Sequence, residues 1–300
     1  MIVDRSNIDT EKRNDQSQNL HKLGSLDCVD LMIEEDRKIH DAMARVKPEL
    51  TALIDGAMPG FNKKGRLIYI GAGTSGRLGV LDASEAPPTF YVDSNKVCGI
   101  IAGGDKSLRN SSEAKEDDLD GAIEVLKKLN LNNEDTLIGI ASGGTTPYVH
   151  GALKYAKGLY KAPLTALLSC SKIEIPTYVD HFIYLATGPE VLTGSTRLKA
   201  GTATKMTLNI ISTTLMVQSG RVYKNYMVDM KATNDKLLDR AIRILTDCTE
   251  LNREKAHALL VKANLSVKTA LVMELREANL EQAETLLKEH KGFLNKILPS

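Results

Sequence analysis

The residues most informative about a possible reaction lie in the segment GAGTSGRLGVLDASEAPPT, residues 71–89. It follows an apolar run that is typical of a buried strand, and it leads into a predicted helix. Gly73, Thr74 and Ser75 at this turn offer backbone N–H groups and two hydroxyls, which are the groups that bind a phosphate at a helix N-terminus. Glu85, ten residues beyond Ser75, adds a carboxyl group. The segment therefore predicts chemistry on a phosphorylated small molecule.

Two other interpretations of this glycine-rich turn stay open. The spacing Gly71-x-Gly73-x-x-Gly76 also occurs in dinucleotide-binding loops, where an acidic residue about 20 residues further on holds a ribose. Here the acidic residue after the second predicted strand is Asp105, roughly thirty residues after Gly76. The hydroxyls of the turn also suit a terminal phosphate monoester better than a dinucleotide. A purely structural turn is the other alternative.

A second polar loop, SGGTT at residues 142–146, follows another predicted strand. Pro147 comes next, at a position that suits the first turn of a helix. Alone, the loop could simply cap that helix. If both loops lie at one edge of a sheet, Ser142, Thr145 and Thr146 join a shared phosphate or sugar site.

A third motif, GPEVLTGSTRLKAGT at residues 188–202, combines hydroxyls on Ser195 and Thr196 with the cations Arg197 and Lys199. We expect one of these cations to neutralise a phosphate or a carboxylate, Arg197 with a bidentate fork. A solvated basic turn is the alternative.

Glu85 and Glu116 are the candidate acid–base pair. Burial and a nearby anion raise the pKa of a glutamate, which turns it into a usable proton donor. Alone, Glu85 could only cap a helix. Glu116 lies in the run EAKEDD, residues 113–118, and the run by itself favours a solvated helix face. The six histidines form no recognisable catalytic set, and we expect His150 on a helix surface.

Composition excludes several classes of protein. The 300 residues carry a net charge of +1, which argues against an electrostatic nucleic-acid binder. The sequence has no apolar run long enough to span a membrane and a polar start, so we expect a cytoplasmic protein. The four cysteines are too scattered for a zinc site or a disulfide framework, and no metal is expected.

Strand-like runs alternate with helix-like stretches through the middle of the chain, which predicts an α/β fold with a doubly wound parallel sheet of five strands. The predicted strands are residues 66–70, 97–102, 136–141, 164–169 and 182–186. The predicted helices are residues 112–129, 146–158 and 206–220. Before them we expect a polar arm to about residue 25 and two amphipathic helices; after them, residues 235–300 predict a small helical domain with breaks near residues 251–252 and 279–280.

The motifs at residues 71–89 and 188–202 resemble the two signatures of the N-acetylmuramic acid 6-phosphate etherase family. Shorter stretches at residues 10–14, 227–229 and 232–234 resemble the family too. The resemblance implies a sugar isomerase (SIS) fold, and a cytoplasmic homodimer with its active site near the subunit interface. It also implies a sugar-phosphate substrate. We expect no cofactor, because an aldehyde of the ring-opened sugar can itself stabilise the developing negative charge, and the composition predicts neither nucleic acid nor membrane as a partner. The expected domains are an N-terminal arm with helices at 1–60, an SIS domain at 61–234 and a helical domain at 235–300.

The family's reaction cleaves a D-lactyl ether, and the resemblance assigns its two glutamates to Glu85 and Glu116. We expect Glu116 to take the C2 proton of the ring-opened sugar and Glu85 to protonate the departing lactyl oxygen. The expected substrate-binding residues are Gly73, Thr74, Ser75, Ser142, Thr145, Thr146, Glu190, Ser195, Thr196, Arg197 and Lys199. One departure concerns the loop ASGGTTPY at residues 141–148, where the family commonly has AASGxTPY; it leaves open which hydroxyl meets the substrate.

Two rival functions are compatible with the same motifs. One is a catalytically silent sugar-phosphate sensor like the glucokinase regulatory proteins, which are longer and carry two such domains. The other is an aldose–ketose isomerase of the same fold, which has no need of an acid over C3. Assaying D-lactate release from muramic acid 6-phosphate would separate all three.

Overall fold

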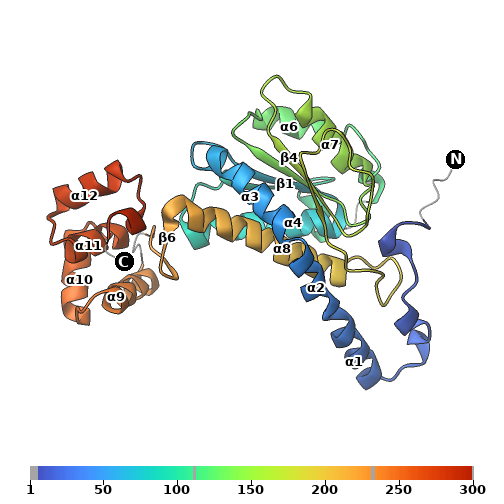
Figure 1. Cartoon of the computed structure of the whole chain (residues 1–300), viewed down its shortest axis with the longest axis horizontal. Coiled ribbons are helices and arrows are strands. Elements are labelled where there is room, and N and C mark those ends of the chain that lie inside the picture. Colours follow the sequence, from blue (N-terminus) through green and yellow to red (C-terminus); the bar gives the residue numbers. More distant parts are fainter. Residues whose placement is uncertain (1–5, 111–112, 231–233, 299–300) are drawn as a thin grey trace. The chain divides into compact units, whose positions relative to one another are not determined.

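The computed structural model describes residues 6–110, 113–230 and 234–298 (Figure 1). Contacts divide the chain into two compact units, one with the residues up to 85 and residues 94–212, the other with residues 86–93 and residues from 213 onward. Each unit has a hydrophobic core of its own. None of the described helices combines the length and the apolar character that crossing a membrane requires.

A sheet of five parallel strands forms the centre of the first unit, in the order β2-β1-β3-β4-β5. The strands are β1 (Leu67–Gly71), β2 (Val97–Ile101), β3 (Thr136–Ile140), β4 (Leu164–Ser169) and β5 (His181–Tyr184). Strands β1 and β3 are buried along their whole length, as expected for a sheet covered on both faces. The predicted parallel sheet is confirmed.

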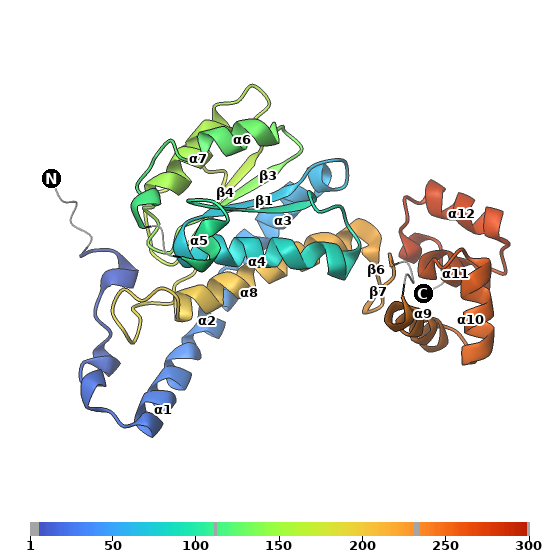
Figure 2. The same cartoon turned by 180° about the vertical axis from the view of Figure 1, so that it is seen from behind.

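Helices cover both faces of this sheet (Figure 2). The side chains along β1 alternate between these two faces. Ile68 and Ile70 belong to the core that packs under α6 (Ile123–Leu129) and α7 (Pro147–Lys157). Tyr69 points the other way, and its hydroxyl donates to Asp82 Oδ2 at 2.9 Å. The helices on that opposite side are α3 (Lys47–Phe61), α4 (Gly73–Phe90) and α8 (Lys199–Met216).

The N-terminal part has more helices than the sequence predicts. Two amphipathic helices were expected before the sheet, whereas the structure has α1 (Ser25–Asp36), α2 (Lys38–Arg45) and α3. Pro48 lies in the first turn of α3, where its missing N–H costs nothing, and it favours a new helix there. The polar arm before α1 contains three short 3-10 turns, at Asp9–Glu11, Asp15–Ser17 and Leu20–Lys22.

The expected helix at residues 112–129 is wrong over most of its length. Residues 113–115 form a single 3-10 turn, and α6 begins only at Ile123. Between them Gly121 N donates to Asp118 O at 3.2 Å, and residues of these types favour turns over helix. Ser112, the first residue of the expected helix, lies outside the described residues. Helix α5 (Lys106–Arg109) precedes this stretch.

The second unit is helical, as predicted. Besides the ends of α4 and α8, its described residues include a two-stranded antiparallel ribbon and four α-helices, namely β6 (Val222–Tyr223), β7 (Tyr226–Met227), α9 (Asp235–Cys248), α10 (Arg253–Lys262), α11 (Val267–Leu275) and α12 (Leu280–Glu289). The two expected breaks are present, and Asn252 and Asn279 cap the helices that follow them. The sequence did not predict the break between α10 and α11, where Ser266 is the cap.

Helix α8 runs over different residues from those predicted. It begins at Lys199, seven residues before the expected start at Met206. After Met216 the chain continues in a π turn, Val217–Arg221, in which Gly220 adopts a φ of 77°. The earlier start places Lys199 inside the first turn of a long helix rather than in a loop.

Candidate active site

The strand order creates a crevice at the carboxyl ends of β1 and β3. The chain goes from β1 outward to β2 and then returns to place β3 on the other side of β1. At such a reversal the two following loops diverge and leave room for a ligand. Both polar loops of the sequence lie there, and Ser75 Oγ is 3.4 Å from Ser142 Oγ. The expected convergence of the two loops is present.

A cavity of about 160 Å³ lies between these loops. Eight residues predicted for the site line it, namely Gly73, Thr74, Ser75, Glu116, Ser142, Thr145, Thr146 and Thr196. Five residues that we had not predicted line it as well, namely Ile8, Glu11, Ala72, Gly143 and Gly194. The cavity thus combines a set of hydroxyls with two carboxylates.

Glycine is required where β1 turns into α4. A Cβ on Gly71 would lie 2.8 Å from Gly76 N, and a Cβ on Gly76 would lie 2.7 Å from Gly71 O. The tight turn brings the first N–H groups of α4 to the cavity, where they favour negative charge. Gly73 has a φ of +52°, and a Cβ there would lie 3.0 Å from Glu116 Oε1. The Glu116 carboxylate therefore lies against the start of α4.

Glu116 is half-buried and sits in a loop, not on a helix face. Its carbonyl oxygen accepts a hydrogen bond from Tyr148 N at 3.0 Å, which ties the loop to the start of α7. Burial, with a contribution from Asp118, raises the pKa of Tyr148 to about 12, so this phenol stays neutral. The broken helix at residues 113–122 is what allows Glu116 to reach the cavity.

The loop after β3 is held by a histidine that we expected on the surface. His150 is half-buried; its Nε2 is 2.7 Å from Gly144 O and its Nδ1 is 2.9 Å from the hydroxyl of Tyr178. Gly144 adopts a φ of +77°, which only glycine takes without strain. Thr146 is the N-cap of α7, yet its side chain makes no capping hydrogen bond. Its hydroxyl is therefore available to a ligand.

Two predicted site residues, Glu190 and Lys199, are buried in the fold instead. The carboxylate of Glu190 accepts from Lys199 N at 3.1 Å and from Ala200 N at 2.8 Å, so it caps α8. Burial raises the pKa of Glu190. Lys199 Nζ forms an ion pair with Glu35 of α1 and donates to Pro189 O at 2.8 Å. Lys199 is 1% exposed, so it has no access to a substrate.

The pKa of Glu35 reflects the partners of this buried pair. Burial alone would raise it, but hydrogen bonds from Lys199, Lys38 and Asn14 lower it below its ordinary value. Lys38 Nζ lies 2.5 Å from Glu35 Oε1, and Asn14 Nδ2 lies 2.7 Å from Glu35 Oε2. The Glu35–Lys199 pair therefore links the N-terminal arm, α1, α2 and α8.

Three further predicted residues do not line the cavity of their own chain. Arg197 is exposed and Ser195 is half-buried, with its N–H donating to Leu192 O at 2.9 Å. Glu85 is exposed on α4, twelve residues after Gly73. At 1.5 Å per residue that is about 18 Å along the helix axis, beyond the reach of a glutamate side chain.

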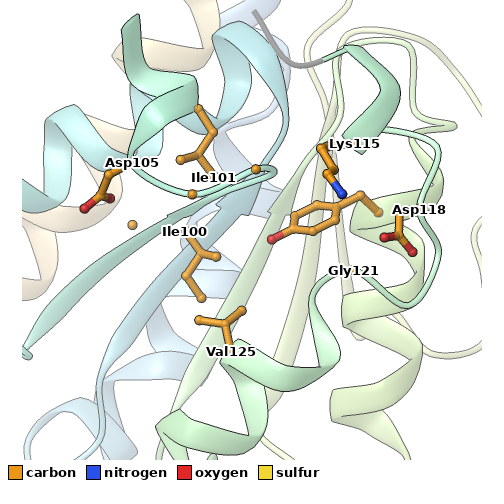
Figure 3. Close-up of a pocket in the computed structure, with 11 residues that line it drawn as sticks. Ile100, Ile101, Asp105, Lys115, Asp118, Gly121 and Val125 are labelled. Atoms are coloured by element: carbon orange, nitrogen blue, oxygen red, sulfur yellow. The ribbon is translucent and has the colours of Figure 1, made fainter. Parts of the chain in front are cut away.

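A larger cavity, of about 350 Å³, lies at the outer strand β2 (Figure 3), and it shares no lining residue with the first. Its lining includes Ile100, Val125, Lys115 and Asp118, the last two from either side of Glu116. Asp105, the residue that a dinucleotide interpretation would use, belongs to this cavity and not to the one at β1 and β3. Among the described residues no group of three His, Cys, Asp or Glu side chains could hold a metal ion.

Comparison with known proteins assigns the chain to a family. Residues 49–157 match the N-terminal SIS domain of glucokinase regulatory protein, and residues 224–268 match its C-terminal lid domain. An N-acetylmuramic acid 6-phosphate etherase of Crocosphaera subtropica is 48% identical over 99% of this chain and 97% of its own. The etherase of Francisella philomiragia is 46% identical, over 96% and 98% of the two chains.

Among solved structures, a phosphoheptose isomerase from Francisella tularensis superposes with a TM-score of 0.48 and 13% identity, over 65% of this chain and 100% of that one. The identity to the etherases, by contrast, extends over nearly the whole length of both chains. This chain therefore belongs to the N-acetylmuramic acid 6-phosphate etherase family.

Proposed function

We propose that the cavity at β1 and β3 cleaves the D-lactyl ether of N-acetylmuramic acid 6-phosphate, giving N-acetylglucosamine 6-phosphate and D-lactate. The observation that carries this proposal is the 48% identity to an etherase over 99% of this chain. A half-buried glutamate, placed among hydroxyls at a helix N-terminus, supports it. The reaction serves the recycling of cell-wall amino sugars, and we propose a cytoplasmic location for it.

The phosphate end of the substrate fits the two loops of the cavity. Thr74, Ser75, Ser142 and Thr146 supply hydroxyl donors, and the first turns of α4 and α7 supply backbone N–H groups. Arg197 and Lys199 were the expected charge partners, but Lys199 is paired inside the fold. Phosphate recognition in the single chain therefore relies on hydroxyls and helix N-termini.

The chemistry needs a base, since an alkyl ether is a poor substrate for direct displacement. Opening of the sugar ring gives a C1 aldehyde, which acidifies the C2 proton. Glu116 takes that proton, and lactate leaves from C3 as a C2–C3 double bond forms. Water then adds to C3, and Glu116 returns a proton to C2. The place of Glu116 beside the helix N-terminus supports this role.

The acid that protonates the departing oxygen remains Glu85 in this proposal, but it acts in a partner subunit. Glu85 is too far along α4 for the cavity of its own chain, as described above. It lies four residues after Leu81, which is 48% exposed, so the two share one outward face of the helix. An exposed leucine beside the proposed acid supports a homodimer in which α4 of each chain reaches the other cavity.

A subunit-mixing experiment tests this arrangement. Glu85→Gln and Glu116→Gln proteins are denatured together and refolded, and D-lactate release is measured against each variant alone. If Glu85 acts in the partner's cavity, half of the subunit pairs are mixed and one cavity in each has both glutamates, so about a quarter of the wild-type rate returns. A mixture as inactive as its components places both glutamates in one chain.

The D-lactate assay on the unmodified protein tests the function itself. The proposal expects equal amounts of lactate and N-acetylglucosamine 6-phosphate. A protein that binds the phosphosugar without releasing lactate would instead be a sensor, the function that the match to glucokinase regulatory protein would favour.

A further inference from the structure

The N-terminal arm brings a second carboxylate, that of Glu11, to the cavity. The residues just before it are fixed. Asp9 Oδ2 accepts from Lys172 N at 3.1 Å and from the Tyr184 hydroxyl at 2.8 Å. Thr10 is fully buried, and its N–H donates to Ser171 Oγ at 3.3 Å. The backbone that carries Glu11 is therefore anchored on the strand ends of the sheet.

Asn14 anchors the arm on the other side of Glu11. It is 4% exposed and donates to Glu35 Oε2 at 2.7 Å and to Pro189 O at 3.1 Å. The buried Glu35–Lys199 pair thus also fixes the arm, and with it the position of Glu11. Glu11 itself is exposed, so its side chain reaches solvent while its backbone is held on both sides.

The side chain of Glu11 lies against the motif at residues 188–202. Gly194 has a φ of +75°, and a Cβ there would lie 3.2 Å from Glu11 Oε2. Among the described residues the Glu11 carboxylate has no hydrogen bond or ion pair, unlike its neighbour Asp9, which pairs with Lys12 at 2.7 Å. An exposed carboxylate on an anchored backbone, at the wall of the cavity, is placed to accept a hydrogen bond from a ligand.

The reaction proposed above needs a proton transfer that neither Glu116 nor Glu85 supplies. Opening the ring moves the proton of the anomeric hydroxyl to the ring oxygen, while the C1–O5 bond breaks and a C1=O1 double bond forms. A carboxylate can take the first proton and deliver one to O5, with no net change. Because phosphate and lactate are anionic, the Glu11 carboxylate suits the neutral hydroxyl end of the sugar.

We propose that Glu11 catalyses ring opening, as a third acidic residue of the active site that acts on O1 and O5 of the sugar. This inference rests on the proposed function, because it concerns the same cavity and substrate. The N-terminal arm would then contribute a catalytic residue. This role also explains why the residues on both sides of Glu11 are held by hydrogen bonds.

Anomer exchange tests the proposal apart from ether cleavage. The two anomers of N-acetylglucosamine 6-phosphate interconvert only through the open chain, so exchange NMR reports ring opening directly. Wild-type protein should accelerate the interconversion, and Glu11→Gln should lose this acceleration by a factor of about 10² or more. Glu116→Gln should keep it, because Glu116 acts on C2. Asp15→Asn, another acidic residue of the arm that does not line the cavity, should match wild type.

Four outcomes are informative. Wild-type exchange in Glu11→Gln overturns the proposal, as does an active etherase that never accelerates anomer exchange. Loss of exchange in Glu11→Gln, with Asp15→Asn unchanged and an unaltered dissociation constant for N-acetylglucosamine 6-phosphate, supports it. A wild-type protein that releases no lactate contradicts the proposed function instead, and its anomer exchange still tests Glu11.

Discussion

Two charged clusters in the first unit have opposite character. At the cavity, Glu11 and Glu116 stand among hydroxyls and helix N-termini, and Glu11 has no partner among the described residues. Below the motif at residues 188–202, Glu35 and Lys199 are almost fully buried, and hydrogen bonds from several elements surround them. Charge alone does not distinguish the two clusters. Burial does, because Glu35 and Lys199 are almost fully buried whereas Glu116 is half-buried and Glu11 is exposed.

Charged residues of one motif can therefore serve either binding or folding. Lys199 and Glu190 lie in a motif with the residue types of an anion site. Both instead form the start of α8, where the Glu190 carboxylate accepts hydrogen bonds from the backbone N–H groups of Lys199 and Ala200. Thr196 and Gly194 of the same motif do line the cavity. Within this one motif, some residues therefore line the cavity and others, a few positions away, stabilise the fold.

The largest effect is expected at Glu116. Replacing it by Gln removes the proposed base without changing its size, so kcat for D-lactate release should fall by a factor of about 10²–10⁴. Urea denaturation should leave the stability of the variant near that of wild type. Asp117→Asn, an exposed neighbour, is the matched control and should keep its activity. If the Glu116→Gln enzyme kept the wild-type rate, this cavity would not be the active site.

Lys199 should show the reverse pattern. Lys199→Met leaves Glu35 buried without its main cation, and breaking a buried pair costs about 3–5 kcal/mol of the free energy of unfolding. Combining it with Glu35→Met should recover part of that loss. Lys205→Met, at an exposed position of the same helix, should be neutral in the same urea titration. If Lys199→Met is as stable as wild type but inactive, the comparison between the two clusters fails.

The hydroxyls of the loop after β3 should affect binding more than turnover. Ser142→Ala and Thr146→Val each remove a donor to the phosphate, and a hydrogen bond to a charged group contributes about 1.5–3 kcal/mol. KM for the sugar phosphate should therefore rise by a factor of about 10–100, with a smaller change in kcat. Thr51→Val, at an exposed threonine of α3, is the control. Unchanged KM in both variants would place the phosphate elsewhere.

The smallest effect concerns pH. The folded pKa of Glu35 lies below its ordinary value of 4.5, so its contribution to stability is complete above that pH and is lost as pH falls through the lowered folded pKa. The stability difference between wild type and Glu35→Gln should thus be constant near neutral pH and narrow as pH falls below 4.5. Thermal unfolding across this range measures it. A difference that widens in acid would contradict the pairing.

The sequence predicted the sheet well because its strands are continuous apolar runs with polar loops at their ends. The loops at residues 71–76 and 142–146 could be placed together, since parallel strands put their carboxyl ends at one edge. The prediction failed where distant contacts decide. Nothing local to Lys199 indicates that Glu35, far away in the chain, covers it.

For Glu11 and Glu116, too, the local sequence does not predict where the side chain lies in the fold. The run around Glu116 has helical composition, and only the turn at Asp118 and Gly121 brings it out of a helix. Glu11 belongs to a polar arm that periodicity cannot place. Its anchors at Ser171, Lys172 and Tyr184 are more than 150 residues away, so folding alone brings them together.

The most direct test of the account follows hydrogen at C2 of the sugar. N-acetylmuramic acid 6-phosphate is incubated with the protein in deuterated water, and the products are analysed by NMR. The account predicts one D-lactate for each N-acetylglucosamine 6-phosphate, with deuterium at C2, and neither product from Glu116→Gln. Lactate release with the original hydrogen still at C2 would contradict it, because no base would then have acted on that carbon.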